Sequence, residues 1–293
     1  MSNEAILISP PADLLGREHA ILSDTGRWYH VPDFKSPLSI KSVLQGSAMW
    51  QIESQRFVVH EGMYVVVNDG QKYTITIDSS EPVTTFCVFF KHGFVEDIHR
   101  NRTTSESVLL DDPEKTTTIE FAQNLVPDAS RVLASLKTLR DGLRDPHCDS
   151  IAALSTLADE LIGADRELQR GMHRLEAERP GTRQELYRRV LRGRDYLLSS
   201  MTATVRHDAV ARAAGLSPYH FHRAFRQAFC ETPHEYLTRY RLNKARQMLL
   251  SSDRSVTDIC LECGFQSPPS FSHLFRRHFG QTPREFRQKS RIR

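Results

Sequence analysis

The chain has 293 residues, with 39 Lys or Arg against 36 Asp or Glu and a formal net charge of +3. This length allows about two domains, each with its own core. No stretch approaches 18 consecutive apolar residues, and residues 1–11 lack a basic start followed by a long apolar segment, so membrane spanning and secretion are disfavoured. Five cysteines, an odd number, suit a reducing compartment, and we expect a cytoplasmic protein.

Basic charge is concentrated in the C-terminal part of the chain. From residue 181 onward, 21 Lys and Arg stand against 9 Asp and Glu, a net charge of +12. Residues 1–180 hold 18 against 27, a net charge of −9. A basic region of this kind is typical of a surface that binds phosphates, although a soluble basic surface is the alternative.

The N-terminal part predicts a β-structure. Residues 1–37 contain several prolines and are expected to form an irregular arm that packs on the next segment. Short β-type runs separated by turns then indicate an antiparallel sandwich or small barrel. The expected strands are 39–44, 48–52, 55–60, 63–67, 73–77 and 83–90.

Aromatic residues in these strands are candidates to line a small-molecule pocket, with ordinary core positions as the alternative. They are Trp50, Tyr64, Phe86, Phe89 and the neighbouring Phe90.

Helical periodicity begins at about Asp128 and continues to Leu168, interrupted at Pro146. Two amphipathic helices are therefore expected, and their apolar faces can cover the β-structure. The linker is predicted at residues 176–182, followed by a helix over residues 183–200.

Residues 256–286 predict a helix, a tight turn and a second helix. Ser255 is expected to cap the first helix, Gly264 to end it, and Ser267 with Pro268 to open the second. Cys260 and Cys263 fall on the buried face of the first helix, and their pairing lacks the partners of a zinc site, so core packing is expected.

The same pattern occurs about fifty residues earlier, over residues 209–236. Gly215 corresponds to Gly264, and Ser217 to Ser267. Each copy ends with a Thr-Pro-x-Glu sequence followed by an aromatic residue, which predicts a capped helix start. A repeat of this kind indicates two structural units.

The paired motif resembles the DNA-binding domain of the AraC family of bacterial transcription regulators, over about residues 190–290. The resemblance implies a two-domain α+β protein: a cupin-like antiparallel β-barrel with dimerisation helices over 1–175, and an all-α domain of two helix-turn-helix motifs joined by a long helix over 183–293. It also implies double-stranded DNA, a small-molecule effector, a homodimer and, for an activator, RNA polymerase as partners.

The resemblance also indicates which side chains contact DNA. The outward positions of the first recognition helix are Pro218, Tyr219, His222 and Arg223, followed by Arg226 and Gln227. In the second they are Pro269, Ser270, His273, Arg276 and Arg277. Arginine can form a paired hydrogen bond with guanine, whereas the second helix departs from the family pattern, so we expect it to contribute mainly phosphate contacts.

Two other functions remain open from the sequence. One is a cupin-type metal enzyme fused to a DNA-binding domain. Cupin enzymes use an H-x-H pair and a Glu, but here only His60 with the adjacent Glu61 is present, so we expect no metal, no cofactor and no catalytic residue. The other is a regulator without an effector, in which the barrel serves only assembly.

Overall fold

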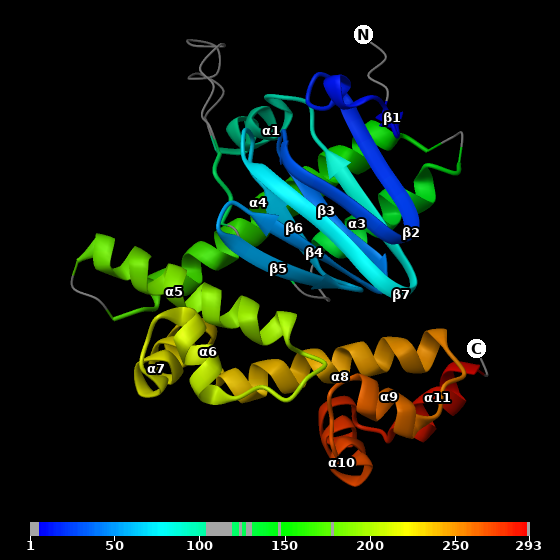
Figure 1. Cartoon of the computed structure of the whole chain (residues 1–293), viewed down its shortest axis with the longest axis vertical. Coiled ribbons are helices and arrows are strands. Elements are labelled where there is room, and N and C mark those ends of the chain that lie inside the picture. Colours follow the sequence, from blue (N-terminus) through cyan, green and yellow to red (C-terminus); the bar gives the residue numbers. More distant parts are fainter. Residues whose placement is uncertain are drawn as a thin grey trace. The chain divides into compact units, whose positions relative to one another are not determined.

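The computed structural model describes residues 6–103, 119–122, 125–126, 131–145, 148–176 and 179–291. The chain separates into two compact units, Met1–Arg170 and Gly171–Arg293, which are described individually. Figure 1 shows a strand-rich first unit and an all-helical second unit. This layout confirms the fold class predicted from the sequence, whereas the functional boundaries at residues 175 and 183 stay predictions. Asp128, Pro146 and residues 177–178 of the predicted linker lie outside the described residues.

In the described part of the first unit, seven strands form one sheet. The order is β1-β2-β7-β3-β6, with β4 pairing both β5 and β7. All pairs are antiparallel except β1 with β2. The strands are β1 Ile6–Ile8, β2 His19–Lys35, β3 Ser39–Gln45, β4 Ser47–Ile52, β5 Gln55–His60, β6 Tyr64–Val67 and β7 Lys72–Phe89.

Two long strands form the centre of this sheet. β7 pairs with β2 from Lys72 to Phe89, and its other edge pairs first with β4 and then with β3. The described pairings do not join β6 back to β1, so the sheet is open where the sequence predicted a barrel. The two runs predicted at 73–77 and 83–90 are one strand, because the intervening polar residues continue the extended backbone.

The N-terminal segment is the clearest departure from the sequence prediction. Residues 1–37 were expected to be an irregular arm, but they include β1, a short 3-10 helix at Ala12–Leu14, and the 17-residue strand β2. The strand pattern of β2 is not evident in the sequence, because two irregularities interrupt its register with β7. They lie between Gly26 and Trp28 and between Val31 and Phe34. Most of its second half is also exposed, which removes the alternation of apolar and polar residues.

Helices cover one face of the sheet (Figure 1). They are α1 Phe94–Thr103, α3 Arg131–Gly142 and α4 Ser150–His173. The apolar stripe recognised in the sequence packs on the sheet, since Val132, Leu136, Leu157 and Leu161 are buried in one core with Val88. The interpretation that these helices cover the β-structure is thereby supported, and their role in a dimer stays a prediction.

Within residues 179–291, the second unit is built from seven helices: α5 Pro180–Ser199, α6 His207–Ala214, α7 Pro218–Phe229, α8 Pro233–Ser251, α9 Val256–Glu262, α10 Pro268–Phe279 and α11 Pro283–Arg291. The first motif is α6 with α7, and the second is α9 with α10. α8 contributes to both, because Tyr236 packs against Phe225 of α7, and Leu242 and Leu249 belong to the core around Phe275 of α10. Along the described parts of the chain, no helix is long and apolar enough to cross a membrane.

Candidate functional site

The turn inside each helix-turn-helix motif is closed by the same hydrogen bonds. Gly215 adopts φ +64° and Gly264 φ +80°, a left-handed conformation that glycine adopts without strain. The residue after each glycine donates its N–H to a carbonyl five residues back, Leu216 to Ala211 and Phe265 to Cys260, both at 3.0 Å. The repeat predicted from the sequence is thus also a repeat of backbone geometry.

Each recognition helix begins with a serine cap. Ser217 Oγ accepts a hydrogen bond from the His220 N–H at 3.3 Å at the start of α7, and Ser267 Oγ accepts one from the Ser270 N–H at 3.4 Å at the start of α10. Pro218 and Pro268 occupy the first helical positions. In the first turn of α7, the Tyr219 N–H can donate to a phosphate oxygen. In α10, Pro268 and Pro269 have no N–H and the Ser270 N–H serves the cap, so this first turn offers no such donor.

The side chains predicted to contact DNA lie on the outer surface of α7 and α10. Tyr219 is 74% exposed, so its ring and its hydroxyl are accessible to a binding partner. The inner faces hold the phenylalanines, with Phe221, Phe225, Phe271 and Phe275 buried. The other predicted contacts are exposed as well, apart from the half-buried Gln227: Pro218, His222, Arg223, Arg226, Pro269, Ser270, His273, Arg276 and Arg277.

Arg223, the predicted base-reading arginine, already has an acidic partner. Its Nη2 lies 2.9 Å from Oε2 of Glu176, which precedes α5. Both side chains are largely exposed, at 59% and 70%, so water can replace either partner at little cost. Glu176 therefore occupies the guanidinium that a guanine edge would need. This contact could not be predicted from the sequence, since 47 residues separate Glu176 from Arg223.

The second recognition helix offers fewer free donors to a base. The Ser270 hydroxyl lies 3.2 Å from the Ser267 hydroxyl and donates to it, so it serves the helix cap. Pro269 has no side-chain donor. Arg276 and Arg277 are exposed further along α10, where they can reach phosphates.

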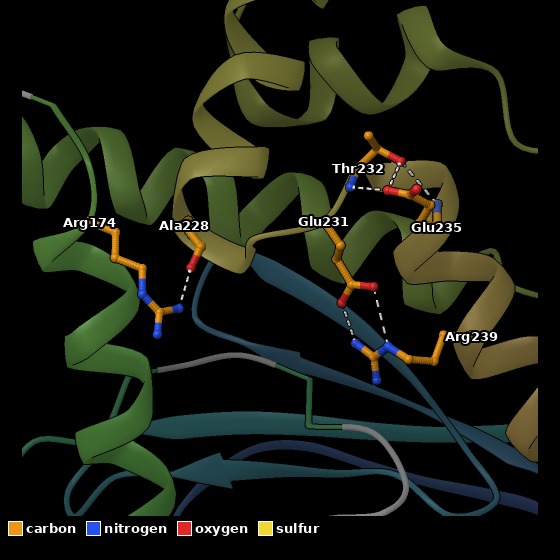
Figure 2. A network of polar contacts seen from close by, with 6 residues as sticks. All are labelled: Arg174, Ala228, Glu231, Thr232, Glu235 and Arg239. Atoms are coloured by element: carbon orange, nitrogen blue, oxygen red, sulfur yellow. Dashed lines mark hydrogen bonds and ion pairs between the residues drawn. The ribbon is translucent and has the colours of Figure 1, made fainter. Parts of the chain in front are cut away.

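Matching capping boxes open the helices that follow the two motifs. Thr232 and Glu235 exchange hydrogen bonds at the start of α8, as Figure 2 shows, and Thr282 and Glu285 do the same at α11. The backbone N–H and then the hydroxyl of Thr232 hold the pKa of Glu235 below its ordinary value. Both Thr-Pro-x-Glu predictions of a capped helix start are confirmed.

Two arginines fix the turn between α7 and α8 (Figure 2). Arg239 of α8 reaches back to the carboxylate of Glu231, with its Nη2 at 2.5 Å from Oε1. Arg174 donates from Nη1 to the Ala228 carbonyl at 3.3 Å, near the end of α7. The end of α7 is thereby attached on two sides, which limits its rotation relative to α8.

Arg241 of α8 is a positioning residue that the sequence interpretation missed. It donates to the carbonyls of Met201 and Ala203 at 2.7 and 2.6 Å, in the loop between α5 and α6. A Cβ added to Gly264 would come within 2.6 Å of the Met201 oxygen. The turn of the second motif thus packs directly against the loop that precedes the first motif, and only glycine fits there.

A hollow of about 580 Å³ lies between the two motifs. Pro218 and His222 of α7 line it, as do Ser267 and Ser270 at the start of α10. Leu237 and Arg241 are among the α8 residues that form its side. The first turns of the two recognition helices therefore border one shared depression, as expected for two elements that contact the same duplex.

In the first unit, a cavity of about 330 Å³ lies on the sheet face opposite α3 and α4. Trp50 and Phe89, two of the pocket candidates named from the sequence, line it. Tyr64, Phe86 and Phe90 do not, because they belong to the core under the helices. Successive residues of a strand point to opposite faces. Phe86 and Phe89 are an odd number of positions apart, so their side chains cannot lie on the same face.

The structure also shows where the candidate metal residues and the cysteine pair lie. His60 ends β5, and Glu61 follows in the turn. Among the described residues, no group of three or more His, Cys, Asp or Glu could hold a metal ion. Cys260 and Cys263 are buried in the core of the second motif, and burial raises the pKa of both thiols. Their predicted role in packing is confirmed.

Known protein families match both parts of the chain. An AraC-like ligand binding domain matches residues 17–162, and a helix-turn-helix domain matches residues 210–289. The chain belongs to the AraC family of transcription regulators. The resemblance found in the sequence is confirmed, including the order of an AraC-type ligand-binding domain and a helix-turn-helix domain.

Individual AraC-family proteins are similar over the C-terminal part. The HTH-type transcriptional activator RhaS of Escherichia coli is 49% identical over 84 residues, which are 29% of this chain and 30% of RhaS. The matched stretch thus spans less than a third of that relative's length.

Two solved structures of transcription regulators are also similar. A transcriptional regulator with an AraC-type DNA-binding domain from Chromobacterium violaceum is 32% identical, covering 38% of this chain and 96% of that one, with a TM-score of 0.33. The DNA-binding domain of AdpA, solved in complex with a target DNA, is 28% identical, covering 35% of this chain and 93% of that one, with a TM-score of 0.34.

Proposed function

We propose that this AraC-family protein binds a specific duplex DNA sequence through α7 and α10 and regulates transcription in response to a small molecule bound in its N-terminal unit. The observation that carries the proposal is the pair of geometrically matching motifs, each with a capped recognition helix and an exposed polar face, in a region of net charge +12. A basic face beside two recognition helices supplies both phosphate attraction and base contact.

In this proposal, the two motifs make different kinds of contact with DNA. The first reads bases with Tyr219, His222 and Arg223, because these side chains are exposed on the first turns of α7. The second contacts phosphates with Arg276 and Arg277, which are exposed along α10. If the protein is an activator, RNA polymerase is its further partner.

The test measures binding of the full chain to selected duplex DNA between about 50 and 200 mM salt. The parent should lose affinity steeply with salt, because phosphate contacts release counterions. Arg276→Ala with Arg277→Ala should reduce the slope of log affinity against log salt by about 2. Lys35→Ala, at an exposed site in the first unit, is the matched control and should leave the slope unchanged. Salt-independent binding by the parent would refute the proposal.

We further propose that the N-terminal unit binds an effector without catalysing a reaction. The cavity beside Trp50 and Phe89 supports ligand binding, since its 330 Å³ falls at the lower end of the range for small-molecule sites, about 300–1,000 Å³. A ligand that binds only the folded state raises the melting temperature, whereas an assembly-only domain would respond to no metabolite. A stoichiometric bound metal together with turnover of a ligand would instead favour the cupin-type enzyme.

A further inference from the structure

The cavity of the first unit is formed by one face of the sheet. Thr85, Cys87 and Phe89 of β7 line it, and they are alternate residues of one strand. Leu22 of β2 lies opposite Cys87 in the register and lines it as well. On the other side of Cys87, the register places Lys41 of β3. Directly paired residues of neighbouring strands point to the same face, so Lys41 lies on the cavity face.

Lys41 is fully buried, with 0% exposure. Its Nζ lies 3.5 Å from the centre of the Phe89 ring and 4.4 Å from that of the Tyr73 ring, and both rings line the cavity. Within the described residues, Nζ has no hydrogen-bond acceptor. A buried amine without a partner is costly, and stacking on aromatic faces compensates only part of that cost.

The charge state of Lys41 reflects this environment. Burial lowers the pKa of Lys41 to about 7, against a small opposing effect of Cys87. The titratable groups nearest to it are Cys87 and Tyr73, whose pKa values burial raises. Tyr29 and Asp24 of β2 line the same cavity. None of these groups is a buried carboxylate that would hold Lys41 in its ammonium form.

A second donor on this face also lacks an acceptor. Trp50 is fully buried and lines the cavity, and its indole Nε1 has no hydrogen-bond partner in the described part of the chain. The rest of the lining is largely apolar, including Leu22, Val31 and Ile75. The cavity thus has one unsatisfied donor in its lining, the Trp50 indole, and a second, Lys41 Nζ, directly against the lining rings of Tyr73 and Phe89.

We propose that this cavity binds a small monocarboxylate with an apolar body, whose carboxylate pairs with Lys41 Nζ. The inference rests on the proposed effector function and specifies the chemical class of the effector. A single lysine matches one negative charge, and a carboxylate supplies the acceptor that the buried amine lacks. The apolar remainder of the ligand would lie against Trp50 and Phe89, whose aromatic area favours it.

The test compares acids with uncharged analogues of the same shape. The full chain is titrated with 3-phenylpropionate and octanoate, and with 3-phenylpropionamide and octanamide, by calorimetry and by thermal shift. The acids should bind at least tenfold more tightly than the matching amides. Lys41→Met should abolish this preference while keeping a folded protein, because methionine fills the site without a polar atom. Lys35→Met, at an exposed site on β2, is the matched control and should retain the preference.

Proton exchange gives a second readout, which a merely structural role of Lys41 would not produce. At pH 8 the free amine is mostly neutral, so acid binding should take up close to one proton, measured in buffers of different ionisation enthalpy. Affinity should then fall about tenfold for each pH unit between pH 7.5 and 9. Lys41→Met should show neither the uptake nor the slope.

The possible outcomes separate this inference from the proposed function. Equal binding of acids and amides, unchanged acid binding by Lys41→Met, or no binding of any acid would overturn the carboxylate assignment. If amides bind and change the affinity for DNA, the effector function stands and only the ligand class is wrong. If no molecule binds and DNA binding is normal, both the ligand class and the effector function fail, and DNA recognition stands.

Discussion

Arg223 and His273 occupy equivalent positions on the two recognition helices, but their chemistry differs. The planar guanidinium of Arg223 can donate two parallel hydrogen bonds to guanine, whereas the imidazole of His273 has at most two donors and a shorter reach. Before it can contact a base, Arg223 must also break its ion pair with Glu176. Breaking this pair costs little free energy, because both side chains are exposed. Base selectivity should therefore depend on α7 more than on α10.

Arg223→Ala is expected to relax sequence preference at one base position, at a cost of about 1–3 kcal/mol against the preferred base. His273→Ala should change the preference little at pH 7.5. The measurement is a binding-site selection with the parent and both variants at fixed salt. Greater loss of sequence information in His273→Ala would reverse the assigned roles.

Glu176→Gln is the companion variant for this measurement. Releasing Arg223 from its acidic partner should raise DNA affinity by up to a few-fold, since an exposed ion pair contributes about 0–1 kcal/mol. Sequence preference should stay as in the parent. Weaker binding by Glu176→Gln would show that this carboxylate positions Arg223 instead of competing with DNA for it.

Burial of Lys41 makes the free energy of unfolding depend on pH. Its pKa falls from 10.5 when unfolded to about 7 when folded, so the unfolded chain binds more protons between these values. The free energy of unfolding therefore increases as pH rises from 7 to 10.5, because the cost of burying a charged amine disappears. Below pH 7 this cost destabilises the folded state in full. Lys41→Met should stabilise the protein more at pH 6 than at pH 9. The stabilisation at the two pH values should differ by on the order of a few kcal/mol. Urea denaturation at both pH values measures this, and an equal gain at both would contradict it.

The two recognition helices end differently. Cys230 follows α7 at φ +60°, where Gly280 follows α10 at φ +77°, and each donates its N–H to a carbonyl four residues back. A left-handed conformation is strained for cysteine and relaxed for glycine. The sequence repeat thus carries one unfavourable substitution at an equivalent site.

Cys230→Gly should consequently stabilise the second unit by about 0.5–1 kcal/mol, and Gly280→Ala should destabilise it by about 1 kcal/mol. A Cβ on Gly280 meets no atom within 4 Å, so backbone strain alone would be responsible. Calorimetric unfolding of the parent and both variants measures the difference. Destabilisation by Cys230→Gly would mean that its thiol contributes to packing.

Elements with strong local signals could be predicted from the sequence. Ser255 and Thr232 act as caps and Gly264 ends its helix as expected, because each of these roles depends on residues within one turn. β2 was missed, since its identity depends on pairing with β7 across about fifty residues. Lys41 and Arg241 were missed for the same reason: a lone basic residue in a sequence does not show which atoms surround it.

The association of two copies of the chain is still a prediction. The apolar stripes of α3 and α4 are buried within one chain, so a dimer through these helices would use their outer face, where Ala134, Lys137 and Thr138 are exposed. In a two-fold interface each substitution occurs twice, which doubles its effect.

Ala134→Glu combined with Lys137→Glu should therefore give folded monomers, as measured by light scattering at micromolar concentration. Leu136→Glu is the informative contrast and should unfold the first unit, because Leu136 is buried under the sheet. A dimer that survives the double substitution would place the interface elsewhere on the chain.

α8 supplies side chains to the cores of both motifs, with Tyr236 in one and Leu242 in the other, and Arg241 ties it to the loop before α6. Neither motif can turn about this helix alone. Inserting one base pair between the two contacted segments of an operator would rotate the second by roughly 35° around the duplex axis. The protein cannot follow that rotation, so its binding sites in a genome should share a single helical phase and tolerate base changes better than changes in spacing.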